Sequence, residues 1–420
     1  MGDFVVEGGQ RLTGTFAVNG AKNAALPLLA AATLADGPVV VHNIPLGIRD
    51  VQLMLQILRT LGMRLHSPAP HVLEIQPPTR LETTIPEALM RQMRASLFLA
   101  GPLVARTGRV TVSRPGGCDI GVRPIDLHLK GLKALGAELE DLPGGRLVVS
   151  APRLVGRKIY LDFPSVGATE NIMMAAVLAD GETVIDNAAR EPEIVDLAQF
   201  LTGLGARIYG AGTDTIRIVG VRRLSGGEHT IVPDRIEAGT VAIAAAITHG
   251  DVEITDMVPE HLVPLWRKLE EMGVELIWQP GGDRVRVRAG PRLRATTART
   301  GPHPGFPTDL QPQMVALMTQ AYGVSTMVET IFENRLKHAG ELGRMGARIL
   351  TDGRMAVIYG PTPLESATVE ATDLRAGAAL ILAGLAATGT TRVVGAEQVE
   401  RGYEDLPRRL AALGALVRAA

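Results

Sequence analysis

Amphipathic segments alternate with β-branched runs along the whole chain, and glycines mark the boundaries between them. Six segments end at a glycine that follows Leu or Met and precedes the next apolar run; these glycines are Gly62, Gly136, Gly205, Gly273, Gly346 and Gly414. A glycine in this place is typical of a left-handed helix cap. Helical spacing over residues 50–60 and 262–271 predicts the helices before two of them.

A second series of glycines follows Ala- and Leu-rich segments and precedes alternating β-branched runs. Its members are Gly37, Gly108, Gly181, Gly250, Gly323 and Gly389. The two series interleave without exception, with 23 to 28 residues from each of these glycines to the next cap glycine. The pattern predicts six copies of one βαβαβ-type unit of about 70 residues.

Six such units favour an α/β fold of two domains with three units each. A domain of about 200 residues has an ordinary size, and a cleft between two such domains favours a ligand site. A plain solenoid is the alternative, but solenoid periods run from about 20 to 50 residues and are shorter than this one.

Composition excludes several classes of protein. The 420 residues carry 43 Lys and Arg against 44 Asp and Glu, and 3% are aromatic, which disfavours a nucleic-acid partner. One cysteine and an N-terminus without a basic stretch before an apolar run indicate a cytoplasmic protein. The apolar stretches 24–35 and 241–247 are too short to span a membrane and predict buried helices.

Common catalytic motifs are missing from the sequence. It has no Gly-Lys pair for a phosphate-binding loop, no His-Glu-x-x-His, no Gly-x-Ser-x-Gly and no cysteine cluster. This disfavours ATP-driven chemistry and structural zinc, and it leaves Mg²⁺ bound by carboxylates open.

Charged residues at the unit junctions are the candidates for chemistry. Lys22 and Asn23 stand where a buried helix begins, so they fit either an anion site or a solvated helix start. Cys118 lies in the glycine-rich segment 114–124, near a predicted helix start and five residues before Arg123. That setting lowers a thiol pKa, although a lone cysteine is also a common core residue.

Three more junctions carry polar residues before or between apolar segments. Asp309 precedes an apolar helix and could act as a base or as a helix cap. The segments 330–335 and 372–375, together with Arg401-Gly402-Tyr403, each fit a surface or capping role as well as a binding role.

Taken together, these segments resemble the enolpyruvyl transferase family, in the branch that acts on a UDP-sugar. The resemblance runs nearly end to end and rests on five motifs in the family's order: Gly20-Ala21-Lys22-Asn23, Pro115-Gly116-Gly117-Cys118, Phe306-Pro307-Thr308-Asp309, residues 329–335 and Arg401-Gly402-Tyr403. It implies two inside-out α/β barrel domains of three repeats each. The first would span 22–232, and the second would combine 1–21 with 233–420.

The resemblance also implies a reaction without a cofactor or a metal ion. The family branch transfers the enolpyruvyl group of phosphoenolpyruvate to the 3′-hydroxyl of UDP-N-acetylglucosamine by addition and elimination, with release of phosphate. This is the first committed step toward peptidoglycan. The oligomeric state stays unknown at this point.

Roles carry over by motif match. Asp309 resembles the base, and Cys118 resembles the acid that can also add to phosphoenolpyruvate and react with the epoxide fosfomycin. Lys22, Arg123 and Arg401 would hold the anion. The other implied substrate contacts are Asn23, Arg94, Pro124, Ile125, Asp126, Leu127, Ser165, Val166, Gly167, Ile331, Arg335, Asp373 and Arg375.

One residue departs from the family pattern, and two other functions compete with this one. Phe163 stands where some relatives carry a lysine that contacts the diphosphate, which leaves Arg123 and backbone amides for that contact. The shikimate-pathway enolpyruvyl transferase shares the fold, but Cys118 and its segment argue against it. A catalytically silent repeat protein that binds nucleotides or a partner would need the charged set to be coincidental.

Overall fold

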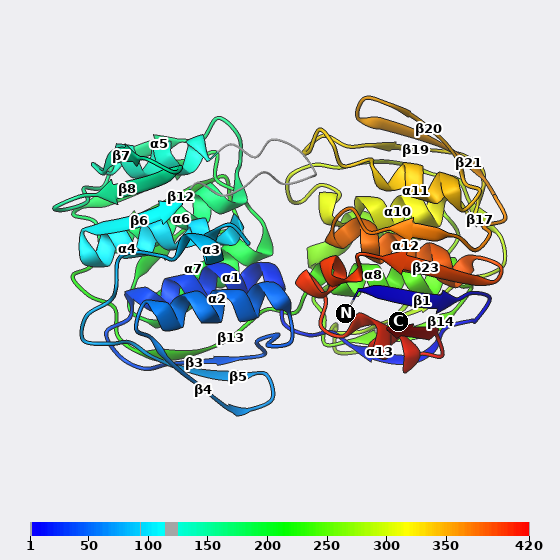
Figure 1. Cartoon of the computed structure of the whole chain (residues 1–420), viewed down its shortest axis with the longest axis horizontal. Helices are drawn as coiled ribbons and strands as arrows, with labels where there is room; N and C mark the ends of the chain where they lie inside the picture. The colour runs from blue at the N-terminus through cyan, green and yellow to red at the C-terminus, as the bar shows by residue number, and fades with distance from the viewer. Residues whose placement is uncertain (1, 93, 114–124, 420) are drawn as a thin grey trace. The chain divides into compact units, whose positions relative to one another are not determined.

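A computed structural model describes residues 2–92, 94–113 and 125–419 of the chain (Figure 1). Clustering of neighbouring residues divides the described part into two compact units. The first unit contains residues 20–113 and 125–232, and the second contains 2–19 and 233–419. The chain passes from one unit to the other next to Asn19 and next to Val232.

The strands of the first unit form three sheets. Their orders are β13-β3-β5-β4, β6-β8-β7 and β11-β12-β10-β9. The strands are β3 (Val39–His42), β4 (Arg64–Ala69), β5 (Val72–Gln76), β6 (Arg109–Ser113), β7 (Glu138–Leu142), β8 (Arg146–Ser150), β9 (Lys158–Tyr160), β10 (Glu182–Asp186), β11 (Arg207–Tyr209), β12 (Thr215–Val219) and β13 (Gly227–Thr230).

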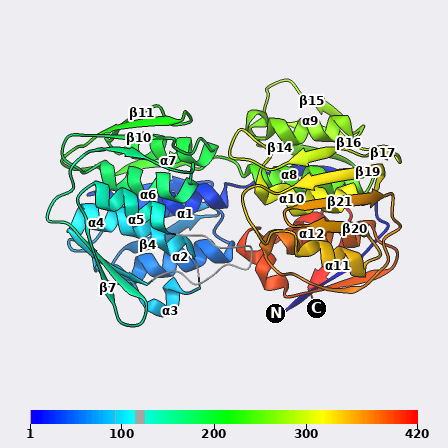
Figure 2. The same ribbon diagram turned by 90° about the horizontal axis from the view of Figure 1, so that it is seen from above.

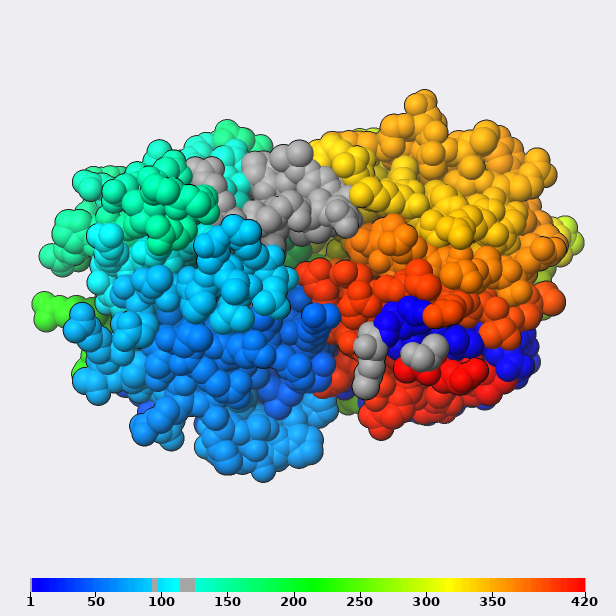
Figure 3. Space-filling model, in the orientation of Figure 1, coloured from blue at the N-terminus to red at the C-terminus, as the bar shows by residue number. Residues whose placement is uncertain are grey.

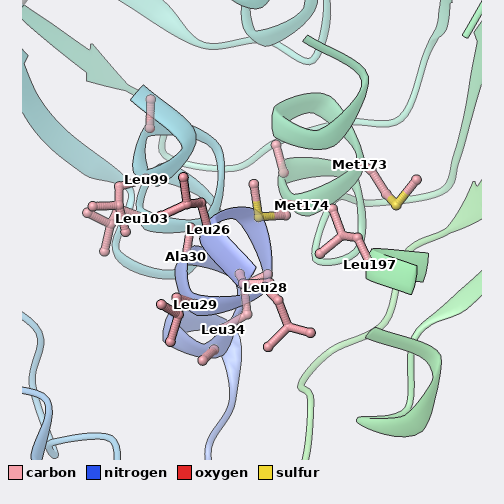
Figure 4. Packing of buried hydrophobic residues seen from close by; sticks show 14 of the residues in the cluster. Leu26, Leu28, Leu29, Ala30, Leu34, Leu99, Leu103, Met173, Met174 and Leu197 are labelled. Carbon is pink, nitrogen blue, oxygen red and sulfur yellow. The ribbon is translucent and has the colours of Figure 1, made fainter. Parts of the chain in front are cut away.

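Helices link these strands. They are α1 (Lys22–Ala31), η1 (Ala32–Leu34), α2 (Arg49–Thr60), α3 (Glu87–Met90), η2 (Arg94–Leu99), α4 (Ala100–Thr107), α5 (Asp126–Ala134), α6 (Val166–Ala176) and α7 (Pro192–Gly203). Nine of the ten residues of α1 are buried, which confirms the predicted buried helix that starts at Lys22. Figure 4 shows Leu26 and Leu28 of α1 among side chains of α4, α6 and α7.

The second unit repeats this plan with strands from both ends of the chain. Its sheet orders are β15-β16-β14-β2, β17-β19-β21-β20 and β22-β23-β1-β24. The strands are β1 (Asp3–Glu7), β2 (Thr13–Ala17), β14 (Asp251–Thr255), β15 (Glu275–Trp278), β16 (Val285–Arg288), β17 (Leu293–Arg294), β18 (Thr297–Arg299), β19 (Ala321–Val328), β20 (Arg348–Asp352), β21 (Met355–Gly360), β22 (Thr368–Glu370), β23 (Thr390–Val394) and β24 (Leu416–Ala419).

The N-terminal strand β1 lies between C-terminal strands. It pairs antiparallel with both β23 and β24, so the first residues complete the last repeat. Figure 3 shows this dark blue segment surrounded by red C-terminal atoms.

Three buried helices form the centre of the second unit (Figure 2). They are α8 (Arg235–Ile247), α10 (Gln311–Met318) and α12 (Leu374–Ala386), and they contact one another. The other helices are η3 (Pro259–Leu262), α9 (Val263–Glu271), η4 (Thr308–Leu310), α11 (His338–Arg344), η5 (Ala396–Arg401) and α13 (Leu406–Ala411). Twelve of the thirteen residues of α8 are buried, because a helix that is apolar all round must be covered on every side.

The cap glycines have the predicted conformation. All six have φ between 90° and 107°, a region that side chains with a Cβ atom rarely enter. In the second series, Gly323 differs from its equivalents because it lies inside β19 and pairs with Gly360. In the described residues, no helix combines the length and the apolar character needed to cross a bilayer.

Candidate functional site

Asp309 is the centre of a charged cluster in the second unit. Its Oδ1 accepts from Nη2 of Arg335 at 3.0 Å, and its Oδ2 accepts from Nη2 of Arg375 at 2.9 Å. The two arginine side chains are almost fully buried, whereas that of Asp309 is 26% exposed. Neither η4, which carries Asp309, nor the apolar helix α10 that follows has a side-chain cap hydrogen bond, so Asp309 does not have the predicted capping role.

Glu329 fixes the two segments that meet at Arg335. The Thr308 hydroxyl donates to Oε2 of Glu329 at 2.9 Å, and the backbone N–H of Ile331 donates to Oε1 at 2.8 Å. Arg335 in turn donates from Nη1 to the Thr308 hydroxyl at 3.3 Å. The buried Glu329 carboxylate therefore ties the loop before α10 to the loop that carries Ile331 and Arg335.

Arg375 extends from the first turn of α12. Asp373 caps this helix, since its Oδ1 accepts from the backbone N–H groups of Arg375 and Ala376 at 2.8 and 3.0 Å. Burial alone would lower the pKa of the Arg375 guanidinium, but the charge of Asp309 and the neighbouring Tyr403 hold this pKa above its ordinary value. Arg375 is thus a permanent cation beside Asp309.

The segment Arg401-Gly402-Tyr403 packs directly on the start of α12. A Cβ atom at Gly402 would lie 2.2 Å from Cδ1 of Leu374 and 3.3 Å from Nη1 of Arg375, so a larger residue would require the end of the Leu374 side chain to move. Arg401 donates from Nη1 to Oε1 of Gln398 at 3.2 Å. The close approach at Gly402 places the backbone of Arg401 beside Arg375.

In the first unit, Lys22 forms a buried ion pair with Asp50. Lys22 is the first residue of α1, Asp50 lies in the first turn of α2, and Lys22 Nζ lies 3.0 Å from Asp50 Oδ2. Both side chains are at most 10% exposed. Lys22 is therefore not a solvated helix start, and Asn23 follows it in the same first turn.

The N-terminus of α6 forms another part of the first unit. Ser165 is its N-cap, and the Ser165 hydroxyl accepts from the backbone N–H of Ala168 at 3.3 Å. A Cβ atom at Gly167 would lie 3.0 Å from Cε1 of His128 and 3.1 Å from Cε1 of Phe98. Ile125 occupies the N-cap position of α5 without a capping hydrogen bond, and Asp126 and Leu127 begin that helix, one turn before Lys130.

Asn171 connects these elements. Its Nδ2 donates to the carbonyl of Leu97 and to Nδ1 of His128, both at 3.1 Å, and its Oδ1 accepts from the backbone N–H of Gly101 at 2.6 Å. Asn171 thus holds α5 and the end of η2 against α6. Arg94 is the first residue of η2.

In the second unit, Asp309, Arg335 and Arg375 form one cluster. The predicted residues of the first unit lie at the starts of α1, η2, α5 and α6, and Asn171 joins the last three of these elements. Cys118, Arg123 and Pro124 lie outside the described residues. Asp50, Asn171 and the cluster-forming role of Glu329 were not predicted from the sequence. The only signal for Asn171 in the sequence was a polar residue inside a predicted buried helix. The position of Asp50 in the sequence is typical of an ordinary acidic residue in the first turn of a helix. Among the described residues, no three His, Cys, Asp or Glu side chains gather so that they could hold a metal ion.

Comparison with known proteins identifies the family. A model described as EPSP synthase (3-phosphoshikimate 1-carboxyvinyltransferase) matches residues 6–410. UDP-N-acetylglucosamine 1-carboxyvinyltransferase 2 of Carboxydothermus hydrogenoformans is 52% identical over 99% of both chains. UDP-N-acetylglucosamine 1-carboxyvinyltransferase 1 of Symbiobacterium thermophilum is 53% identical over 99% of this chain and 94% of that one.

The chain belongs to the enolpyruvyl transferase family. The resemblance inferred from the motifs is therefore confirmed.

Solved structures agree with this membership. The enolpyruvyl transferase NikO from Streptomyces tendae has a TM-score of 0.90 at 28% identity, covering 99% of this chain and 98% of its own. EPSP synthase from Acinetobacter baumannii has a TM-score of 0.77 at 19% identity over both full chains, which supports the fold alone. The predicted α/β enolpyruvyl transferase fold is confirmed.

Proposed function

We propose that this enolpyruvyl transferase joins phosphoenolpyruvate to the 3′-hydroxyl of UDP-N-acetylglucosamine and releases phosphate, in the cytoplasm. The observation that carries the proposal is the Asp309 carboxylate between two buried guanidinium groups, in a chain 52% identical to relatives named for this transfer. The reaction begins peptidoglycan precursor synthesis.

The Asp309 cluster contains the base and the cations that this chemistry needs. Two guanidinium groups donate hydrogen bonds to the Asp309 carboxylate and so favour its ionised form. The ionised form is the one that can take the proton of the sugar hydroxyl. Two guanidinium groups and one carboxylate leave one net positive charge among the three. That charge, with Arg401, would attract the phosphate and carboxylate groups of phosphoenolpyruvate and stabilise the tetrahedral intermediate.

The remaining roles follow the family motifs. We assign Cys118 as the acid that protonates the methylene carbon of phosphoenolpyruvate and that can also add covalently to phosphoenolpyruvate, at the neighbouring carbon. We assign Lys22 and Arg123 as cations that hold the phosphate. Asp50 keeps the buried Lys22 ammonium paired and oriented, because a lone buried cation would be strongly disfavoured.

We assign the nucleotide-sugar to the first-unit residues around α5 and α6, with Ile331 and Asp373 as contacts in the second unit. The N-terminus of α6 offers backbone N–H groups to the diphosphate. Phe163 is 43% exposed and cannot supply a cation. Asp162, the residue before Phe163, accepts from Nζ of Lys130 at 2.6 Å. Lys130 therefore gives this chain a cation near the position where some relatives carry a lysine.

Phosphate release with alternative acceptors tests the proposal. The purified full chain is incubated with phosphoenolpyruvate and either UDP-N-acetylglucosamine, shikimate 3-phosphate or no acceptor. We expect release only with UDP-N-acetylglucosamine. Release only with shikimate 3-phosphate would assign the other branch of the family, and no release from folded protein would favour the nucleotide-binding repeat protein.

A further inference from the structure

Gln313 lies one turn after Asp309, and its side chain points back to it. Gln313 is fully buried in α10, and its Nε2 donates to the backbone carbonyl of Asp309 at 3.1 Å. The same Nε2 lies 2.9 Å from the hydroxyl of Tyr403 and 3.2 Å from that of Thr240. An amide nitrogen has two hydrogens, so one serves Asp309 and the other serves this pair of hydroxyls.

The neighbouring hydroxyls fix the direction of the second bond. Thr240 donates its hydrogen to the carbonyl of Ile236 at 2.7 Å, so the Tyr403 hydroxyl must donate to Oγ1 of Thr240, 2.9 Å away. The oxygen of Tyr403 is then free to accept from Gln313. Each group in this chain therefore donates to the next: Gln313 donates to Tyr403, Tyr403 donates to Thr240, and Thr240 donates to the backbone of α8.

Tyr403 also supports the cation on the other side of Asp309. The guanidinium carbon of Arg375 lies 5.1 Å from the centre of the Tyr403 ring, within cation–π range. Arg375 bonds Oδ2 of Asp309. The contacts close a ring in which Asp309 is held by its backbone through Gln313 and by its carboxylate through Arg375, with Tyr403 joining the two.

We propose that Gln313 and Tyr403 are positioning residues for Asp309, and that they fix the base relative to Arg375 without touching the substrates. The inference rests on the proposed function, in which Asp309 is the base. Burial raises the pKa of the Tyr403 hydroxyl, so it stays a donor at neutral pH. A base that is held on two sides moves less from the position in which it reacts. A displacement of about 1 Å from that position can lower the rate about 100-fold.

The test compares Gln313→Met and Tyr403→Phe with a matched control, Gln320→Met. Gln320 follows the end of α10 that is remote from Asp309, and its Nε2 donates to the Thr319 hydroxyl and to the carbonyl of Thr362 at 2.9 and 3.0 Å. We expect Gln313→Met to lower kcat by about 10- to 100-fold, with KM for either substrate within about 3-fold. We expect Gln320→Met to leave kcat within about 2-fold of the unchanged protein.

The double variant separates positioning from packing. Tyr403→Phe keeps the ring over Arg375 and removes only the hydroxyl, so we expect a loss in kcat of about 3- to 10-fold. Both residues act through one ring of contacts. The variant that combines Gln313→Met with Tyr403→Phe should therefore have a kcat at most about 2-fold lower than that of Gln313→Met alone. Full multiplication of the two losses, a change confined to KM, or equal losses in Gln313→Met and Gln320→Met would overturn the proposal.

Failure of the proposed function gives a different result. In that case the unchanged protein releases no phosphate with any acceptor. The three single variants are then compared by urea unfolding with two double variants, Gln313→Met with Tyr403→Phe and Gln313→Met with Gln320→Met, which gives two double-mutant cycles. Coupling between Gln313 and Tyr403 without coupling between Gln313 and Gln320 would support the ring of contacts, and equal coupling would overturn it.

Discussion

The Nζ atom of Lys22 lies 3.0 Å from Oδ2 of Asp50, and both side chains are almost completely buried. Replacing Asp50 by Asn keeps the shape of the side chain and removes its charge. We expect a loss of about 3–5 kcal/mol in the free energy of unfolding, because the buried Lys22 ammonium loses the counter-charge of Asp50. Urea unfolding measures this loss.

The same substitution should also weaken the reaction, because Lys22 is assigned to the phosphate. We expect at least a 10-fold decrease in kcat/KM for phosphoenolpyruvate. The control is Glu270→Gln, which removes the exposed partner of Arg267 and should change neither quantity measurably. Wild-type stability in Asp50→Asn would contradict the structural role assigned to the pair.

Gly402 tests the close packing beneath Arg401. In Gly402→Ala, the Cβ atom would force the end of the Leu374 side chain to move and would crowd Nη1 of Arg375. We expect a loss of about 1–3 kcal/mol in the free energy of unfolding and a lower kcat/KM. Gly343→Ala in α11 is the matched control: its Cβ would meet no atom within 4 Å, and alanine favours the helix. Equal stability of the two variants would show that Gly402 has room for a side chain.

The repeats could be predicted from the sequence because each depends on local chemistry. A cap glycine or an apolar helix can be recognised from a few neighbouring residues. All six cap glycines have the expected positive φ. Partners in space could not be predicted. Taken alone, the residues around Asp309 favoured a helix cap over a base. Only the fold shows that its carboxylate contacts Arg335 and Arg375, which lie 26 and 66 residues away in sequence.

Glu237 predicts a pH dependence of stability. Burial raises its pKa from 4.5 to about 7, although Arg409 opposes the shift, and Asp234 adds to it. Between these two values the folded protein keeps a proton that the unfolded chain has lost, so the stability contributed by Glu237 is complete below about pH 4.5 and is lost as the pH rises through 7.

Glu237→Gln removes this titration. Compared with this variant, the unchanged protein should lose roughly 3 kcal/mol of stability between about pH 4.5 and pH 7.5. Urea unfolding at both values gives the difference, in which titrations shared by the two proteins cancel. A difference independent of pH would contradict the raised pKa.

Cys118 predicts the response to an epoxide such as fosfomycin. Cys118→Ala should escape alkylation, because the thiolate is the nucleophile. Cys118→Asp should also escape but keep turnover, because a carboxylic acid can still deliver a proton. Mass spectrometry of the intact chain follows the label, and labelling of Cys118→Ala would contradict the assignment.

The structure of the product tests the central claim most directly. The purified chain is incubated with phosphoenolpyruvate and UDP-N-acetylglucosamine, and the nucleotide-sugar is analysed by proton and carbon NMR. We expect an enolpyruvyl ether on the 3′-oxygen of the sugar, formed in equal amount with free phosphate. Phosphate and pyruvate without an ether, or an enolpyruvyl group formed only on shikimate 3-phosphate, would contradict it.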